Sequence, residues 1–218
     1  MLNYEIISTG SKGNAVVIND RILIDCGVPF KMIEKNVKFL SLVLLTHIHG
    51  DHFKTSTIIR LAKARPTLRF VCGKHLVTPL LSCGVREQNI DVVEAEKVYN
   101  YSFVSIEPVT LVHDVENLGY KLFFPNEKKL FYATDTANLN GIEAKGFDLY
   151  MVEANYVTEE IDKRIDEKKA NLQFAYERRA KRYHLSKELA DDFIYKNIGV
   201  NGEYIYLHSH REEGTKNE

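Results

Sequence analysis

Residues 42–52 are Leu42-Val43-Leu44-Leu45-Thr46-His47-Ile48-His49-Gly50-Asp51-His52. The apolar start predicts a buried strand that ends at Thr46, and the pattern of 53–64 predicts a helix. Three imidazoles and one carboxylate therefore lie on a strand-to-helix turn, where they can converge. Such side chains are the usual ligands of Zn²⁺ and similar ions. A solvated His-rich loop is the alternative, but polar clusters directly after buried strands favour a site for one or two metals.

Three further polar residues end later predicted strands. His113 follows 109–112, Asp135 follows 130–133, and His208 ends the last apolar strand. A strand-end histidine is, taken alone, more often structural or exposed. A carboxylate such as Asp135 has two oxygens and can bridge two ions. His210, two residues beyond His208, is the rival for the last ligand.

The pattern His-x-His-x-Asp-His after an apolar strand resembles the signature of the metallo-β-lactamase fold, and the similarity extends over nearly the whole chain. The resemblance implies an α/β (α+β) fold, a four-layer αββα sandwich with two mixed β-sheets face to face and helices outside. The sequence pattern alone predicts only a mixture of helices and strands. Residues 1–213 are expected to form a single domain, followed by a polar tail at 214–218.

The same resemblance implies a site for two divalent metal ions, Zn²⁺ or Mn²⁺. One ion would be held by His47, His49 and His113, and the other by Asp51, His52 and His208, with Asp135 as the bridge. Asp25 is expected to support the histidine cluster from behind, since metal-bound imidazoles usually donate their other N–H to a carboxylate. A turn aspartate that caps the following loop is an equal alternative for Asp25.

Two more segments resemble particular branches of the family. The glycine-rich loop of residues 9–14 resembles the Gly-Ser-x-Gly-Asn loop of the small WalJ (YycJ)-like group, which implies that Ser11 and Asn14 contact a substrate phosphate. The segments Glu153-Ala154-Asn155 and His184-Leu185-Ser186 resemble elements of ribonuclease Z, in which a glutamate orients a proton-donating histidine. Glu153 and His184 are then catalytic, and Asp51 also orients the nucleophile. A helix-entry histidine without a role is the alternative for His184.

The function implied is hydrolysis of a phosphodiester through a hydroxide shared by two metals. A leaving alkoxide needs an acid such as His184, which favours a phosphodiester. DNA is the first choice of substrate, as for a 5′-exonuclease. A small phosphodiester such as a cyclic nucleotide, as cleaved by phage counter-defence proteins of this fold, is the runner-up. A lactam, thioester or lactone hydrolase would not need Glu153 and His184. A non-catalytic binding module is a fourth possibility, against which the complete ligand set argues.

Only 21 residues separate His113 from Asp135, which leaves no room there for the long tRNA-gripping arm of ribonuclease Z. Residues 163–187 hold nine Lys or Arg and three Asp or Glu, which suggests either a phosphate-binding surface or an ordinary solvated helix face. Helices are expected at 158–182 and 187–197. Ser186 would cap the second helix, with Leu189 and Phe193 on its buried face.

Composition adds general limits. The chain of 218 residues has a net charge of −1 and 44% hydrophobic residues, enough for a sizeable core. No apolar run is long enough to span a membrane, and no signal peptide is evident. Cys26, Cys72 and Cys83 lack metal-ligand spacing and are expected to be buried thiols. A cytoplasmic location follows as the default, and the resemblance makes a homodimer possible.

Overall fold

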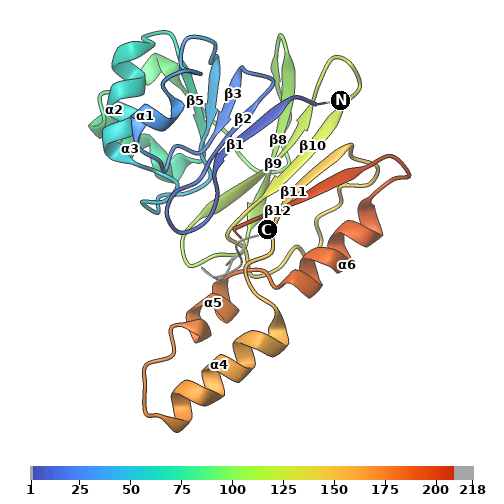
Figure 1. Cartoon of the computed structure of the whole chain (residues 1–218). Helices are drawn as coiled ribbons and strands as arrows, with labels where there is room; N and C mark the ends of the chain where they lie inside the picture. Colours follow the sequence, from blue (N-terminus) through green and yellow to red (C-terminus); the bar gives the residue numbers. More distant parts are fainter. Residues whose placement is uncertain (1, 209–218) are drawn as a thin grey trace, which may run out of the picture.

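The computed structural model describes residues 2–208 and contains two six-stranded mixed sheets (Figure 1). The first sheet runs in sequence order and comprises β1 (Tyr4–Ser8), β2 (Ala15–Ile18), β3 (Ile22–Ile24), β4 (Leu42–Leu44), β5 (Arg69–Cys72) and β6 (Ile90–Val92). Its first three strands are antiparallel, and β3 to β6 are parallel. The loops after β3 and β4 therefore emerge side by side at one end of the sheet.

The second sheet has the order β12-β11-β10-β9-β8-β7. Its strands are β7 (Tyr99–Tyr101), β8 (Val104–Leu111), β9 (Asn117–Phe123), β10 (Lys129–Ala133), β11 (Leu149–Glu153) and β12 (Glu203–Leu207). Strands β7 to β10 are antiparallel, whereas β10, β11 and β12 are parallel. The carboxyl ends of these last three strands consequently meet at the same end of the sheet.

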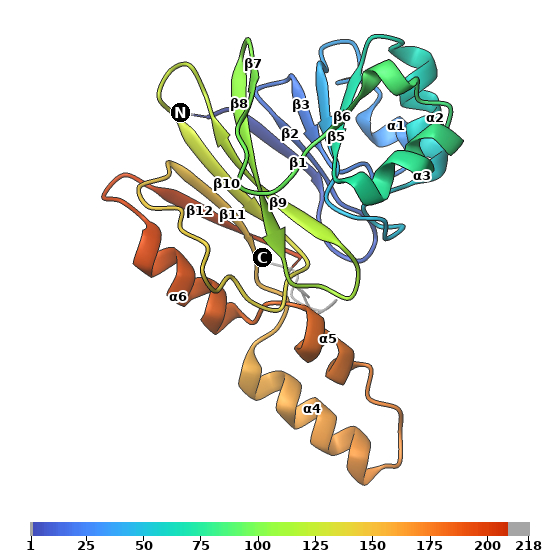
Figure 2. The same ribbon diagram turned by 180° about the vertical axis from the view of Figure 1, so that it is seen from behind.

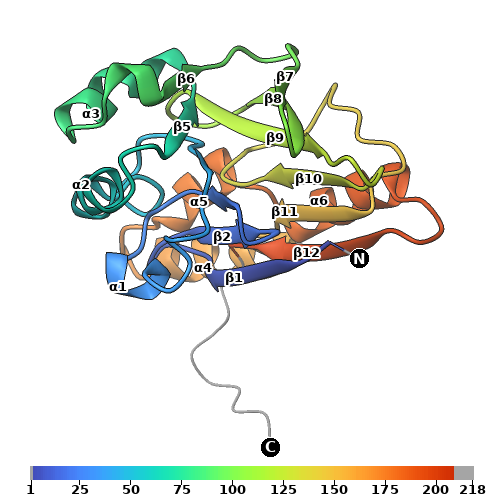
Figure 3. The ribbon, with the colours of Figure 1, turned by 90° about the horizontal axis from the view of Figure 1, so that it is seen from above.

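The two sheets pack face to face, and helices cover both outer faces, as Figures 1 and 3 show. On the first sheet lie α1 (Phe30–Ile33), α2 (Thr55–Ala64) and α3 (Val77–Ser82), with short 3₁₀ turns η1 (Lys74–Leu76) and η2 (Glu87–Asn89); on the second lies α6 (Lys187–Asn197). Strand β2 is wholly buried because it serves two cores. Val16 and Ile18 pack between the sheets, while Ala15 and Val17 face the helices. The predicted four-layer sandwich is confirmed.

A helical hairpin projects from this body (Figures 1 and 2). It consists of α4 (Thr158–Ala170) and α5 (Glu177–Tyr183), so the expectation of one helix over 158–182 was wrong. The chain leaves the helix after Ala170, and Leu172 has a left-handed backbone with φ 55°. Ion pairs of Lys168 with Glu177 and of Lys181 with Asp162 join the two helices. Charged side chains that could have formed a solvated helix face therefore connect α4 to α5 instead.

Other expectations differ in detail. Strand β8 continues through Pro108, because its neighbour β7 pairs only as far as Ile106 and does not need the missing N–H. Leu189 is half exposed, whereas Phe193 is buried as expected, and Ser186 Oγ accepts the Leu189 N–H as the predicted cap. Among residues 2–208, no helix has the length and apolar character needed to cross a membrane. The expected tail at 214–218 lies outside the described residues.

Candidate metal and hydrolytic site

The histidine cluster follows β4 and leans on the loop after its parallel neighbour β3. The Asp25 N–H donates to the Leu44 carbonyl, and Asp25 Oδ1 accepts the Thr46 N–H at 2.9 Å. Asp25 Oδ2 lies 2.7 Å from His52 Nδ1. Burial raises the pKa of Asp25, and the neighbouring His52 opposes this effect. Asp25 thus lies behind the cluster and fixes which nitrogen of His52 faces forward.

A first group of donors comprises His47, His49, His113 and Asp135, whose ligand atoms all lie within 4.8 Å of one another. His47 Nε2 is 3.2 Å from His49 Nδ1, which is 3.3 Å from His113 Nε2. Burial and the neighbouring His52 hold the pKa of His47 far below its ordinary value. Its imidazole is therefore neutral, as a metal ligand must be.

The hydrogen bonds of these rings test whether the group suits a metal. The His113 Nδ1–H donates to the Tyr183 carbonyl at 3.0 Å, and His47 Nδ1 lies 2.9 Å from Thr46 Oγ1. The His49 ring has the opposite orientation, because its oxygen contact is made by Nε2, which lies 3.4 Å from Asp114 Oδ1. Each ring thus has an oxygen partner on one nitrogen, and the other nitrogens of the three rings face one another. His47 Nε2 and His113 Nε2 lie 3.5 and 4.0 Å from Asp135 Oδ2, and His113 Nε2 is also 3.2 Å from Asp114 Oδ1. Lone pairs that converge in this way fit a divalent cation.

A second group comprises Asp51, His52 and Asp135. His52 Nε2 lies 3.2 Å from Asp135 Oδ2 and 3.8 Å from Asp51 Oδ2. The two groups share Asp135, whose pKa is held well below its usual range because His52 and His208 outweigh the effect of burial. This carboxylate lies between the two donor groups, where a bridging ligand would be placed.

His208 lies on the other side of Asp135. Its Nδ1 is 2.6 Å from Asp135 Oδ1 and 3.3 Å from Glu153 Oε1. The structure accordingly brings His208 together with Asp135, Glu153 and His184, and not with the Asp51 and His52 group that the resemblance implied. Burial lowers the pKa of His208, but the hydrogen bonds of the two carboxylates outweigh it and raise the pKa to about 10. The rival ligand His210 lies outside the described residues.

Three of these residues share an unusual backbone. Asp25, Asp135 and His208 have φ values of 59°, 55° and 50°, and each follows closely on the end of a strand. A non-glycine residue in this region costs free energy and persists only where its surroundings demand it. The left-handed step turns each side chain out of its strand and toward the common centre.

The glycine-rich loop lies against the histidine loop. Asn14 is almost fully buried, and its Nδ2 lies 3.2 Å from the Asp51 carbonyl and 2.8 Å from His52 Nε2. Ser11, in contrast, lines the open pocket over the donor groups. Asn14 therefore lies beneath the site rather than facing a substrate phosphate as expected. Close packing explains Gly27, since an added Cβ would lie 1.7 Å from the Asp51 carbonyl oxygen.

The buried Glu153 and the partly exposed His184 form an acid–imidazole pair beside the donor groups. His184 Nδ1 lies 2.6 Å from Glu153 Oε1, and Glu153 Oε2 accepts the Thr136 N–H at 2.9 Å. Burial alone lowers the pKa of His184, but the hydrogen bond and charge of Glu153 outweigh it and raise the pKa. His184 also lines the pocket, which has a volume of about 380 Å³. A raised pKa and an open position suit a proton donor.

Sequence reasoning missed three residues of this site. Asp114 lies 3.4 Å from His49 and pairs with Arg179 of α5, while Tyr176 and Arg179 line the pocket from the hairpin. The position of Asp114 directly after His113 was the available signal. Nothing local marks Tyr176 and Arg179, because the fold of the hairpin brings them to the pocket.

The beta-lactamase superfamily domain matches residues 20–190. The chain belongs to this superfamily. Exodeoxyribonuclease YycJ of Bacillus anthracis is 23% identical over 172 residues, an alignment that covers 72% of this chain and 64% of that protein. The match therefore spans less than two thirds of the relative's length.

Solved structures show the same fold. The metallo-beta-lactamase fold protein YhfI of Bacillus subtilis superposes with a TM-score of 0.71 at 14% identity, covering 96% of this chain and 87% of YhfI. The short form of human tRNase Z superposes with a TM-score of 0.67 at 14% identity, covering 94% of this chain and 92% of tRNase Z. A diphosphatase of the PhnP family superposes with a TM-score of 0.65 at 15% identity, covering 96% of this chain and 87% of the diphosphatase. The metallo-β-lactamase fold and the His/Asp groups together imply that this hydrolase-fold chain binds divalent metal.

Proposed function

We propose that the protein is a metal-dependent phosphodiesterase that cleaves nucleotide phosphodiesters, with DNA as the first candidate substrate. The observation that carries the proposal is the Glu153–His184 pair, placed beside the Asp135-centred donor groups. A phosphodiester leaves as an alkoxide, which departs poorly unless a proton reaches it. A thioester, in contrast, releases a thiolate, which leaves readily without a separate acid of this kind. The named relative, an exodeoxyribonuclease, supports the same class of chemistry.

In this proposal His47, His49 and His113 hold one divalent ion, Zn²⁺ or Mn²⁺, and Asp51 and His52 hold a second, with Asp135 shared. Bound ions would activate water for attack and neutralise charge on the phosphate. His208 lies against both Asp135 and Glu153, so it would complete the second ion's ligands only after a change of partner.

In this proposal each side chain has a separate catalytic or positioning role. Asp51 lies at the pocket and orients the attacking water, while His184 donates a proton from Nε2 to the leaving oxygen. Glu153 holds His184 through Nδ1 and stabilises its protonated form. The Thr136 N–H fixes the other oxygen of Glu153, so the acid pair is tied to the end of β10 beside Asp135.

The charge of the hairpin bears on the size of the substrate. Five of the nine basic residues in 163–187 form ion pairs with acidic side chains: Arg164, Lys168, Arg179, Lys181 and Lys187. Helix α4 also carries acidic residues at its start, so the positive charge gathers on α5. This partial neutralisation favours a second candidate, a cyclic or other small nucleotide, over a long polyanion.

Cleavage assays with added Zn²⁺ or Mn²⁺ distinguish the candidates. The substrates are end-labelled single- and double-stranded DNA and a panel of cyclic mononucleotides, with Asp135→Ala as the control for contaminating nucleases. DNA cleavage that weakens steeply with salt identifies a nuclease, because a polyanion releases counterions on binding. Cleavage of cyclic nucleotides with intact DNA selects the small substrate. Hydrolysis of a lactam or thioester alone, unaffected by His184→Ala, overturns the proposal.

A further inference from the structure

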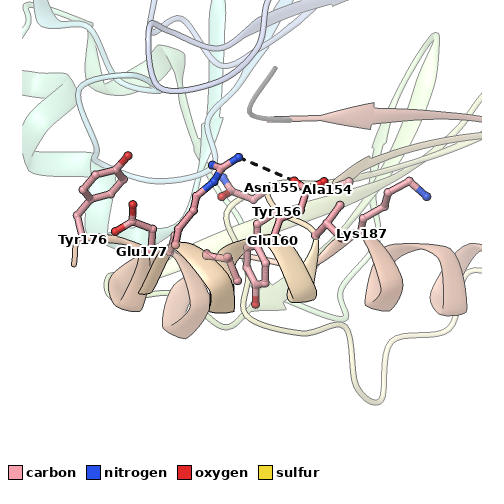
Figure 4. Close-up of a pocket in the computed structure, with 11 residues that line it drawn as sticks. Ala154, Asn155, Tyr156, Glu160, Tyr176, Glu177 and Lys187 are labelled. Carbon is pink, nitrogen blue, oxygen red and sulfur yellow. Dashed lines mark ion pairs between the residues drawn. The ribbon is translucent and has the colours of Figure 1, made fainter. Parts of the chain in front are cut away.

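A second pocket adjoins the metal pocket, between the base of the hairpin and the end of β11 (Figure 4). Asn155, Tyr176 and Ala180 line both pockets, so the two share a wall. Tyr176 lies at one end of the second pocket and Lys187 at the other (Figure 4). The geometry points to a subsite for the nucleoside that carries the leaving oxygen. This inference rests on the proposed function, because the subsite matters only if a nucleotide phosphodiester is cleaved next to it.

The face of α5 connects the two pockets. Tyr176 directly precedes α5, Ala180 lies within it and His184 directly follows it, so the three residues succeed one another along the helix at a spacing of four residues. His184 lines the metal pocket, and the other two line both pockets. A group whose oxygen takes a proton from His184 therefore extends along this face into the second pocket.

Its size suits one ring system. The pocket has a volume of about 170 Å³, close to the ~150 Å³ cavity that holds a benzene molecule. It is smaller than the roughly 300–1,000 Å³ of sites for larger ligands. Val157, Ile161 and Tyr176 supply apolar and aromatic surface, as a stacked base requires. One base or one sugar fits this description, and a dinucleotide does not.

Two buried acceptors mark the pocket as polar. Asn155 and Glu177 are 3% and 4% exposed and both line it. Within the described part of the chain, Asn155 Oδ1 and Glu177 Oε2 have no hydrogen-bond partner. A buried acceptor without a donor is destabilising, because it has lost its hydrogen bonds to water. The amino and imino groups of bases and the hydroxyls of sugars are donors, and they would meet this need.

The test measures nucleoside binding apart from catalysis. ¹⁵N-labelled full-length protein, with and without Zn²⁺, is titrated with adenosine, guanosine, cytidine and thymidine. At least one nucleoside is expected to give saturable shifts at the amides of Val157, Ile161 and Tyr176, independent of Zn²⁺. Val157→Phe, which fills this pocket only, should weaken binding by at least ~10-fold. Val157→Thr has nearly the same shape and should bind as the wild type does.

Kinetics provide the second readout. On the cleaved nucleotide substrate, Val157→Phe should raise KM with little change in kcat, because it removes binding shared by ground and transition states. If a phosphodiester is cleaved but no nucleoside binds and Val157→Phe leaves KM unchanged, the subsite is wrong and the proposed function stands. If nucleosides bind at these amides but no phosphodiester is cleaved, the pocket recognises nucleosides and the proposed function fails.

Discussion

His184 Nδ1 lies 2.6 Å from Glu153 Oε1, although 30 residues of hairpin and connecting chain separate the two in sequence. The contact joins the end of β11 to the end of α5. It leaves His184 Nε2 as the atom that can donate a proton into the pocket.

Replacement of His184 by alanine should therefore separate catalysis from metal binding. We expect turnover to fall by ~10²–10⁴-fold, the usual contribution of a general acid, while metal content stays at the wild-type value. Activity assays and metal analysis by mass spectrometry on the same samples measure both. Loss of metal in His184→Ala would show that the residue is a ligand and not an acid. Glu153→Gln should lower kcat in the same direction and shift its pH profile, since it removes the charge that raises the pKa of His184.

Asp135→Ala should remove metal and activity together. Asp135 is 2% exposed and belongs to every donor group identified among the described residues. Its loss also leaves His52 without one of its three carboxylate partners. Treatment of the wild type with a chelator should likewise abolish activity, and added Zn²⁺ or Mn²⁺ should restore it, whereas the variant should not recover. An Asp135→Ala protein with full metal content and activity would refute the placement of the site.

Gly27→Ala should destabilise the protein, because the new Cβ would lie 1.7 Å from the Asp51 carbonyl oxygen and 2.7 Å from the His52 amide nitrogen. We expect a loss of about 1–3 kcal/mol in the free energy of unfolding, typical of overpacking, together with weaker metal binding. Gly50→Ala, in the histidine loop against which Gly27 packs, is the matched control, since a Cβ there meets nothing within 4 Å. Urea unfolding of both variants measures the difference. Equal stability of the two would show that the loop can move aside.

Glu188 should stabilise the base of the hairpin in a pH-dependent way. Its carboxylate accepts the Thr158 N–H at 3.0 Å and the Thr158 hydroxyl at 2.9 Å, at the start of α4. Burial acts to raise its pKa, but these hydrogen bonds outweigh burial and lower the pKa to about 2. A lowered folded-state pKa gives stability that is complete above the unfolded value and is lost as the pH falls toward the folded one.

The comparison is between wild type and Glu188→Gln. At pH 7 the variant should be about 1 kcal/mol less stable, the usual value for a helix cap. The difference should shrink as the pH falls from about 4.5 toward about 2. Thermal unfolding at a series of pH values measures it. A difference that does not depend on pH would assign the effect to packing rather than to the charge.

The sequence was most informative where polar residues follow apolar strands. Strand β10 ends at Ala133 as predicted, and His47, His113 and Asp135 converge as their strand-end positions suggested. These features depend on local patterns and on the rule that carboxyl ends of parallel strands meet. The short, half-exposed strands β6 and β7 escaped prediction because they carry little apolar alternation.

Tertiary contacts account for what sequence could not show. The break after Ala170 has no glycine or proline to announce it, and ion pairs between the two helices hold the hairpin together. The burial of Asn14 depends on the approach of the Asp51 loop, 37 residues away. His208 faces Glu153 because β11 and β12 are paired in register, with Glu153 opposite Leu207. No residue spacing within a single segment encodes these relationships.

The insertion of α4 and α5 between Glu153 and His184 has a consequence for how this protein could be diversified. The hairpin tip, where Leu172 and Phe174 are 96% and 88% exposed, can be shortened, extended or exchanged without altering a metal-donor residue outside the hairpin. The two ends of the hairpin have no such freedom, since any change in the distance between them moves the proton donor His184 relative to the Glu153 carboxylate. The same hairpin therefore has two parts with different tolerance to change. Its tip can vary in sequence and length, whereas its two ends must keep the distance between Glu153 and His184.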